Sequence, residues 1–238
     1  LVEIIHRAQV DRKDRPYDPN FYQQVDHRLM MSRDYAKSVA REISTRAKKQ
    51  RGETTHLSVM DAAGNVVSLT QSIERVYGSC EMCPSLGFLY NNYMSAFDVE
   101  DISHPYYLRP NGVPWASVSP TIVFKGKAAQ LAIGSPGSER IAPAILQVLL
   151  RLENQSLLDA ITSPRLFCSH DSVVWMESPR IRTDLVPALK RRGYKIKDME
   201  SFSFYLGCVQ AVMRERDTFI GAADPRRDGS AGGPKENE

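Results

Sequence analysis

The fold is constrained most by strand–turn–strand patterns that follow Gly52. In each pattern, two segments suited to β-strands flank a short turn-forming sequence, which predicts a β-hairpin. The second pattern continues into a Gly-containing turn and an apolar helical stretch, so strand, turn and helix follow in order. Strands with helices between them predict a layered α+β architecture. The predicted hairpins pair residues 56–61 with 66–71 and 121–124 with 128–133, and the helix covers 141–152.

Other segments are assigned from periodicity and from helix-terminal residues. Ser32 is a candidate N-cap for a helix that runs to about Lys49, because Tyr35, Val39 and Ile43 fall on one stripe. Residues 1–31 show little periodicity, and the tail after residue 227 is expected to be a frayed loop. Further helices are predicted at 156–162 and 183–192, and further strands at 173–176, 208–213 and 218–222.

Composition excludes several classes of protein. The 238 residues are 42% hydrophobic and 25% charged, which is typical of a globular domain and rules out wholesale disorder. The longest apolar stretch is interrupted by Gln147 and Arg151 and is too short for a membrane span. The net charge of +3 is too small and too dispersed to indicate nucleic-acid binding. The chain begins at Leu1 and not at Met, so we interpret it as a piece of a longer protein.

The four cysteines do not form a zinc-binding pattern. Cys80 and Cys83 form one CxxC pair, but Cys168 and Cys208 lie far apart in the sequence and supply no second pair. We therefore predict no metal site, and either a local disulfide or two idle thiols at Cys80 and Cys83.

Two segments carry groups that are suited to catalysis or ligand binding. Thr54, His56 and Ser58 share one face of a predicted strand, although a half-exposed strand is the simpler explanation of this pattern. The turn Gly134-Ser135-Pro136-Gly137-Ser138 opens a helix and presents backbone N–H groups that can hold an anion or a developing oxyanion. The alternative is a plain strand-to-helix turn capped by Ser138. Paired Asn91 and Asn92 indicate another turn.

Taken in order, several blocks resemble the γ-glutamyltransferase (γ-glutamyl transpeptidase) family of N-terminal-nucleophile hydrolases. The resemblance covers nearly all of this chain but only the C-terminal part of a family member. The blocks are Thr54-Thr55-His56-Leu57-Ser58-Val59, Thr70-Gln71-Ser72-Ile73, Leu89-Tyr90-Asn91-Asn92-Tyr93-Met94, Ser119-Pro120-Thr121, Gly134-Ser135-Pro136-Gly137, Pro164-Arg165 and Ala223-Asp224-Pro225-Arg226-Arg227.

The resemblance implies an αββα sandwich and a precursor that cuts itself between Glu53 and Thr54. Residues 1–53 then end the large subunit, and residues 54–238 form the small, catalytic subunit. The cut matters because a Thr hydroxyl is a poor nucleophile without a base, and a free α-amine with a pKa of roughly 7.7–8.0 is a suitable one. The implied partners are the rest of the large subunit and a small γ-glutamyl substrate, with no metal or organic cofactor.

Site residues follow from the resemblance position by position. Thr54 matches the nucleophile, Ser72 the hydroxyl residue beside it, and the N–H groups of Gly137 and Ser138 the oxyanion hole. Ser117 matches a serine that binds the substrate α-carboxylate. The pocket for the substrate α-amino group departs from the family pattern, with Glu74, Tyr93 and Ala96 in place of the usual side chains. Asp224, Arg226 and Arg227 are interpreted as a structural ion-pair corner, and His56 receives no proton-transfer role.

The implied activity is hydrolysis or transfer of the γ-glutamyl group of glutathione and similar amides. The altered pocket keeps a related acylase open, acting on a glutaryl or cephalosporin-type amide. A family member that never cuts itself and is not catalytic is a further alternative. The resemblance also implies a periplasmic or extracellular location, and we expect the 238-residue chain alone to be inactive because half of its pocket is missing.

Overall fold

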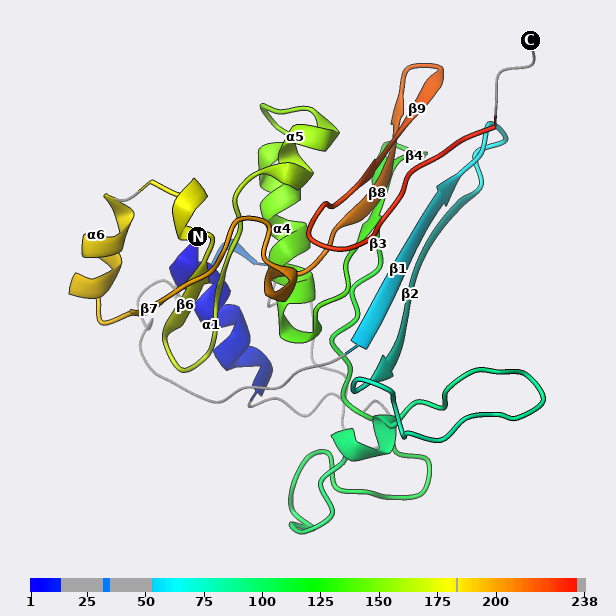
Figure 1. The fold of residues 1–238 in the computed structure, drawn as a ribbon, viewed down its shortest axis with the longest axis vertical. Helices are drawn as coiled ribbons and strands as arrows, with labels where there is room; N and C mark the ends of the chain where they lie inside the picture. Colours follow the sequence, from blue (N-terminus) through cyan, green and yellow to red (C-terminus); the bar gives the residue numbers. More distant parts are fainter. Residues whose placement is uncertain (14–31, 35–52, 183, 235–238) are drawn as a thin grey trace.

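The computed structural model describes residues 1–13, 32–34, 53–182 and 184–234, and its centre is a four-stranded antiparallel sheet. The strands lie in the order β3-β4-β8-β9 (Figure 1). The predicted hairpin of β3 and β4 is confirmed, and so are the strands β8 and β9. Their bounds are β3 Thr121–Lys125, β4 Ala128–Gly134, β8 Gln210–Glu215 and β9 Thr218–Ala223.

One face of this sheet packs against two helices, α4 (Ile141–Arg151) and α5 (Leu157–Thr162). Alternate residues of β4, Leu131 and Ile133, point into this core and are at most 3% exposed. Both helices are confirmed from the sequence, and the Ser156 hydroxyl caps α5 by accepting a hydrogen bond from its third residue.

The other face of the sheet carries the hairpin of β1 (Glu53–Met60) and β2 (Val66–Glu74), which the sequence also predicts. Figure 1 shows this hairpin in cyan beside the sheet. Its inner face is polar, and the Ser68 hydroxyl links two strands of the sheet. It donates to the Ile133 carbonyl at 3.1 Å and accepts from the Thr121 N–H at 3.1 Å. The side chain of Ser68, and that of Ser58 through the Gln210 carbonyl, therefore join the two β layers.

A second core lies to one side, around a small sheet in the order β5-β6-β7. Phe167, Val174 and Trp175 from this sheet pack with Val2 and Ile5 of helix α1. The sheet comprises β5 Leu166–Cys168, β6 Val173–Met176 and β7 Lys195–Asp198, with helices α1 Val2–Lys13 and α6 Leu185–Arg191 beside it.

Several expectations from the sequence need correction or lie outside the described residues. Residues 1–31 were expected to lack periodic structure, but α1 begins at Val2, and β5 and β7 were not predicted at all. The described part of the tail, residues 228–234, has no helix or strand, as expected for a loop, and lines a cleft beside β1 and β8. The helix predicted from Ser32 to Lys49 falls almost entirely outside the described residues. Within the described part of the chain, no helix is long and apolar enough to cross a bilayer.

Candidate active site

The start of the β1–β2 hairpin brings Glu53, Thr54, Ser72 and Glu74 together. Thr54 lies directly opposite Ser72 across the two strands. The Thr54 hydroxyl donates to the Ser72 hydroxyl oxygen at 3.0 Å, and the Ser72 hydroxyl donates to the Glu53 carbonyl at 2.8 Å. The Glu74 N–H also donates to the Ser72 oxygen, at 3.0 Å. Ser72 is thus fixed by two donors and aimed at the carbonyl of the bond between Glu53 and Thr54.

The backbone is irregular at this point. Glu53 pairs with Glu74 while Thr54 pairs with Ser72, so Ile73 forms a β-bulge opposite the bond between Glu53 and Thr54. Glu74 has a φ of 71°, a left-handed conformation that costs a residue with a side chain of order 1 kcal/mol or more. Burial raises the pKa of the Glu74 carboxyl, and the charge of Arg75 opposes that shift.

His56 lies two residues beyond Thr54 and is 7% exposed. Its ring is held by the Thr70 hydroxyl at 2.8 Å and the Ser58 hydroxyl at 2.9 Å. Burial lowers the pKa of His56 to about 4, so the imidazole is neutral at physiological pH. A Cβ on Gly134 would lie 2.1 Å from the ring, so only glycine fits there. This explains the glycine at the end of β4, for which the sequence pattern indicates only a turn.

Gly137 and Ser138 lie on the turn between β4 and α4. Gly137 has a φ of 133° and Ser138 a φ of 54°, so the turn presents its N–H groups through conformations that side chains disfavour. Among the described residues, neither N–H donates to a carbonyl. Pro136, just before them, lines the same 880 Å³ cleft as Thr54, whereas Gly137 and Ser138 do not line it.

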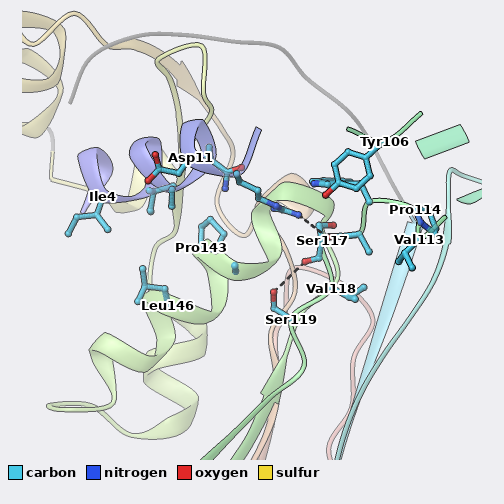
Figure 2. Close-up of a pocket in the computed structure, with 17 residues that line it drawn as sticks. Ile4, Asp11, Tyr106, Val113, Pro114, Ser117, Val118, Ser119, Pro143 and Leu146 are labelled. Carbon is cyan, nitrogen blue, oxygen red and sulfur yellow. Dashed lines mark hydrogen bonds between the residues drawn. The ribbon is translucent and has the colours of Figure 1, made fainter. Parts of the chain in front are cut away.

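Of the other predicted pocket residues, one lies near Glu74 and one lines a different cavity. Tyr93 begins a 3₁₀ turn directly after Asn92, whose N–H donates to the Ile73 carbonyl and whose side chain accepts from the Arg75 N–H. Tyr93 therefore lies near Glu74. Ser117 lines a separate cavity between α1, α4 and residues 113–119 (Figure 2).

The ion-pair interpretation holds for Asp224 and Arg226 but is wrong for Arg227. Asp224 pairs with Arg165 at 2.7 Å and with Arg226 at 3.0 Å, and Arg226 pairs with Glu177 at 2.6 Å, all fully buried. Arg227 instead stacks over Phe204 at 3.8 Å and lines the cleft of Thr54.

The cysteines and acidic groups offer no metal site in the described ranges. Cys80 and Cys83 are free thiols in the structure, so the local disulfide is not formed there.

Comparison with known proteins decides the family. The family model for gamma-glutamyltranspeptidase matches residues 1–233. The chain belongs to the γ-glutamyltranspeptidase family. It is 32% identical to the glutathione hydrolase proenzyme of Bacillus subtilis strain 168 over 96% of its own length and 37% of that protein's. It is 31% identical to the acylase ACY 1 proenzyme of Pseudomonas sp. strain V22, over 97% and 42% of the two lengths. The chain therefore spans about two fifths of these relatives.

The fold agrees with that membership. The gamma-glutamyltranspeptidase of Pseudomonas nitroreducens, in its mutant W525D, superposes with a TM-score of 0.68 at 26% identity, over 76% of this chain and all of that one. The architecture is the αββα sandwich of N-terminal-nucleophile hydrolases. In the described residues, the β1–β2 hairpin, the four-stranded sheet and the pair α4 and α5 supply three of its four layers.

Proposed function

We propose that the full-length precursor cuts itself between Glu53 and Thr54 and that Thr54 then acts as the nucleophile on γ-glutamyl amides such as glutathione. The observation that carries the proposal is the Ser72 hydroxyl, which contacts both the Thr54 hydroxyl and the Glu53 carbonyl. A donor on that carbonyl polarises it toward attack and stabilises the oxyanion that forms.

The proposed self-cleavage is an acyl shift supported by this arrangement. The Thr54 oxygen attacks the Glu53 carbonyl carbon, the hydroxyl proton passes to the peptide nitrogen, and the C–N bond breaks to leave an ester between Glu53 and the Thr54 side chain. Water then hydrolyses the ester, leaving the Glu53 carboxylate and a free Thr54 amine. Residues 1–53 become the end of the large subunit, and 54–238 the small subunit. The free amine of Thr54 accepts a proton and so acts as a base, whereas the peptide nitrogen before cleavage does not.

In the mature enzyme the Thr54 oxygen attacks the γ-amide carbonyl of the substrate. The α-amine takes the hydroxyl proton and delivers it to the leaving amine, while the N–H groups of Gly137 and Ser138 stabilise the oxyanion. The γ-glutamyl ester on Thr54 then passes to water or to an amino-acid acceptor.

The substrate's amino-acid end is assigned to the remaining pocket residues. Glu74, half-buried beside Thr54, supplies a carboxylate for the α-ammonium group, with Tyr93 next to it. The resemblance assigns Ser117 a hydroxyl contact to the α-carboxylate, although Ser117 lines a different cavity from Thr54 in this structure. Because Glu74 lies on the strand that carries Ser72, donor recognition and the nucleophile share one element.

The rest of the precursor is proposed to cover the outer face of the β1–β2 hairpin. Leu57, Val59, Val67 and Leu69 on that face are between 46% and 53% exposed. The relatives are more than twice as long as this chain, and the fourth layer of the sandwich belongs on this face.

A second candidate is an amide acylase. The 31% identity to the acylase ACY 1 proenzyme and the presence of Tyr93 and Ala96 in the amino-acid pocket favour it. Turnover of γ-glutamyl and glutaryl p-nitroanilides separates the two, because only the first substrate has an α-amino group for Glu74 to bind.

The deciding experiment is intact-mass measurement on full-length protein incubated at neutral pH, with Thr54→Ala as the control. We expect a new fragment that begins at Thr54, absent from the control. An intact chain under all conditions contradicts the proposal and favours a family member that binds without catalysis.

A further inference from the structure

We propose that helix α1 positions the two loops that handle the acyl group, through Gln9 for the turn at Ser138 and Arg12 for the loop at Ser117. Both are positioning residues, since neither touches the nucleophile. The kinetic part of this inference rests on the proposed function. Its structural part does not.

Gln9 holds the oxyanion turn from behind. Its side chain is 7% exposed, and Nε2 donates to the Glu139 carbonyl at 3.2 Å. Glu139 directly follows Ser138, whose φ of 54° is disfavoured for a residue with a side chain. A strained turn keeps its shape only when its surroundings hold it, and Gln9 supplies one such contact.

Arg12 holds the residues just before Ser117. Its guanidinium lies 4.3 Å from the centre of the Trp115 ring and donates to the Ala116 carbonyl at 3.2 Å. One side chain thus fixes both a ring and a backbone carbonyl in consecutive residues. The charge of Arg12 also opposes the rise that burial causes in the pKa of the Glu139 carboxyl.

The cavity in Figure 2 makes these contacts important. A space of about 740 Å³ separates α1, α4 and residues 113–119, and Ser117 lies at its edge. The loop is therefore not packed tightly against either helix on this side. Its position depends on discrete polar and stacking contacts, and these are lost one at a time on substitution.

The opposite side of α1 is firmly anchored. Val2 and Ile5 pack into the core around the β5–β6–β7 sheet, and His6 Nε2 lies 3.2 Å from the His170 carbonyl oxygen. A helix fixed on one side and reaching two loops on the other is suited to setting their relative position.

The kinetic test uses processed full-length enzyme, with active sites counted by intact mass. Gln9→Met keeps the side-chain volume but removes the donor, so we expect kcat to fall about tenfold with KM changed less than twofold. Arg12→Met should raise KM about tenfold for γ-glutamyl and glutaryl p-nitroanilides, which carry the carboxylate. It should leave KM for 4-aminobutyryl p-nitroanilide, which lacks that carboxylate, unchanged.

Two matched variants separate positioning from general damage. Arg12→Lys retains a cation and a donor and should recover most of the lost KM. Glu3→Gln, on the same helix, removes a surface ion pair with Arg192 and should leave both constants unchanged. Equal losses for all three substrates, or the same loss in Glu3→Gln, would overturn the inference.

Hydrogen exchange tests the positioning contacts of Gln9 and Arg12 without measuring activity. In the uncut Thr54→Ala precursor, Arg12→Met should speed exchange in residues 114–118 and Gln9→Met in residues 137–140, each leaving the other segment unchanged. Unaltered exchange in both overturns the inference. Absence of cleavage and turnover in the wild-type protein would contradict the proposed function. The exchange result would then decide by itself whether α1 positions the two loops.

Discussion

At the scale of single residues, the Ser72 hydroxyl is the group on which the proposed cleavage depends most directly. Ser72→Ala removes the donor to the Glu53 carbonyl, and loss of a comparable oxyanion donor costs about a hundredfold in rate. We expect cleavage of the full-length precursor, followed by intact mass over time, to slow by about that factor.

Ser72→Thr keeps a hydroxyl and should cleave at close to the wild-type rate. Ser68→Ala, on the same strand, removes a hydroxyl that bonds the neighbouring sheet, so it should leave the cleavage rate unchanged. A Ser72→Ala precursor that cleaves as fast as wild type contradicts the assigned role.

His56 gives the precursor a pH-dependent stability. Its pKa is about 4 in the folded state, against an ordinary value of 6.5. The unfolded chain therefore takes up a proton between those values and the folded chain does not. Stability from the neutral ring is complete above about pH 6.5 and is lost as the pH falls toward 4, at up to ~1.4 kcal/mol per pH unit.

Denaturant unfolding of the Thr54→Ala precursor between pH 4.5 and 6.5 should show this slope. In His56→Gln the side chain cannot take up a proton. The free energy of unfolding should therefore depend less steeply on pH, by up to the effect of one bound proton. Identical slopes for the two proteins contradict the buried neutral histidine.

At the scale of elements, the buried ionic cluster joins the two cores. Glu177 in this cluster accepts from Arg226 at 2.6 Å and from Arg180 at 3.1 Å. Glu177→Gln leaves a buried positive charge uncompensated, and breaking such a pair costs about 3–5 kcal/mol. Chemical denaturation should show a loss of that size. Asp184→Asn, which breaks an exposed pair with Arg182, should leave the free energy of unfolding nearly unchanged.

Which elements could be predicted from sequence follows from how each one is stabilised. The β1–β2 hairpin and α4 are visible because turn residues and apolar periodicity act locally. Helix α1 was missed because it buries polar His6 and Gln9 beside only two apolar residues, Val2 and Ile5. β7 was missed because its sequence is Lys-Ile-Lys-Asp and its strand character comes from parallel pairing with β6.

Some features of the candidate site could likewise be predicted from sequence and others could not. Thr54 and Ser72 are identified by the resemblance, and their opposition follows from the hairpin register. The fit of Gly134 against His56 and the approach of α1 to Ser117 come from contacts between segments distant in sequence. No local pattern encodes such contacts.

At the scale of the whole molecule, the outer face of the β1–β2 hairpin predicts opposite behaviour in the isolated chain and in the precursor. Leu57→Ser with Leu69→Ser makes a half-exposed surface more polar in the 238-residue chain, so it should lower binding of a hydrophobic dye without loss of stability. In the full-length precursor the same pair should lower the free energy of unfolding by about 2 kcal/mol or more. Equal effects in both proteins contradict coverage of this face.

Helix α1 also precedes the bond between Glu53 and Thr54, whereas the loops it contacts follow that bond. In the proposed mature enzyme that bond is cut, and the contacts of Gln9 and Arg12 would then join two separate polypeptides. The covalent connection that keeps α1 beside the loops is then lost, and their association depends on the concentrations of the two polypeptides. The active geometry becomes a property of an assembly, and prolonged dilution should erode turnover in a way that no uncut precursor would show.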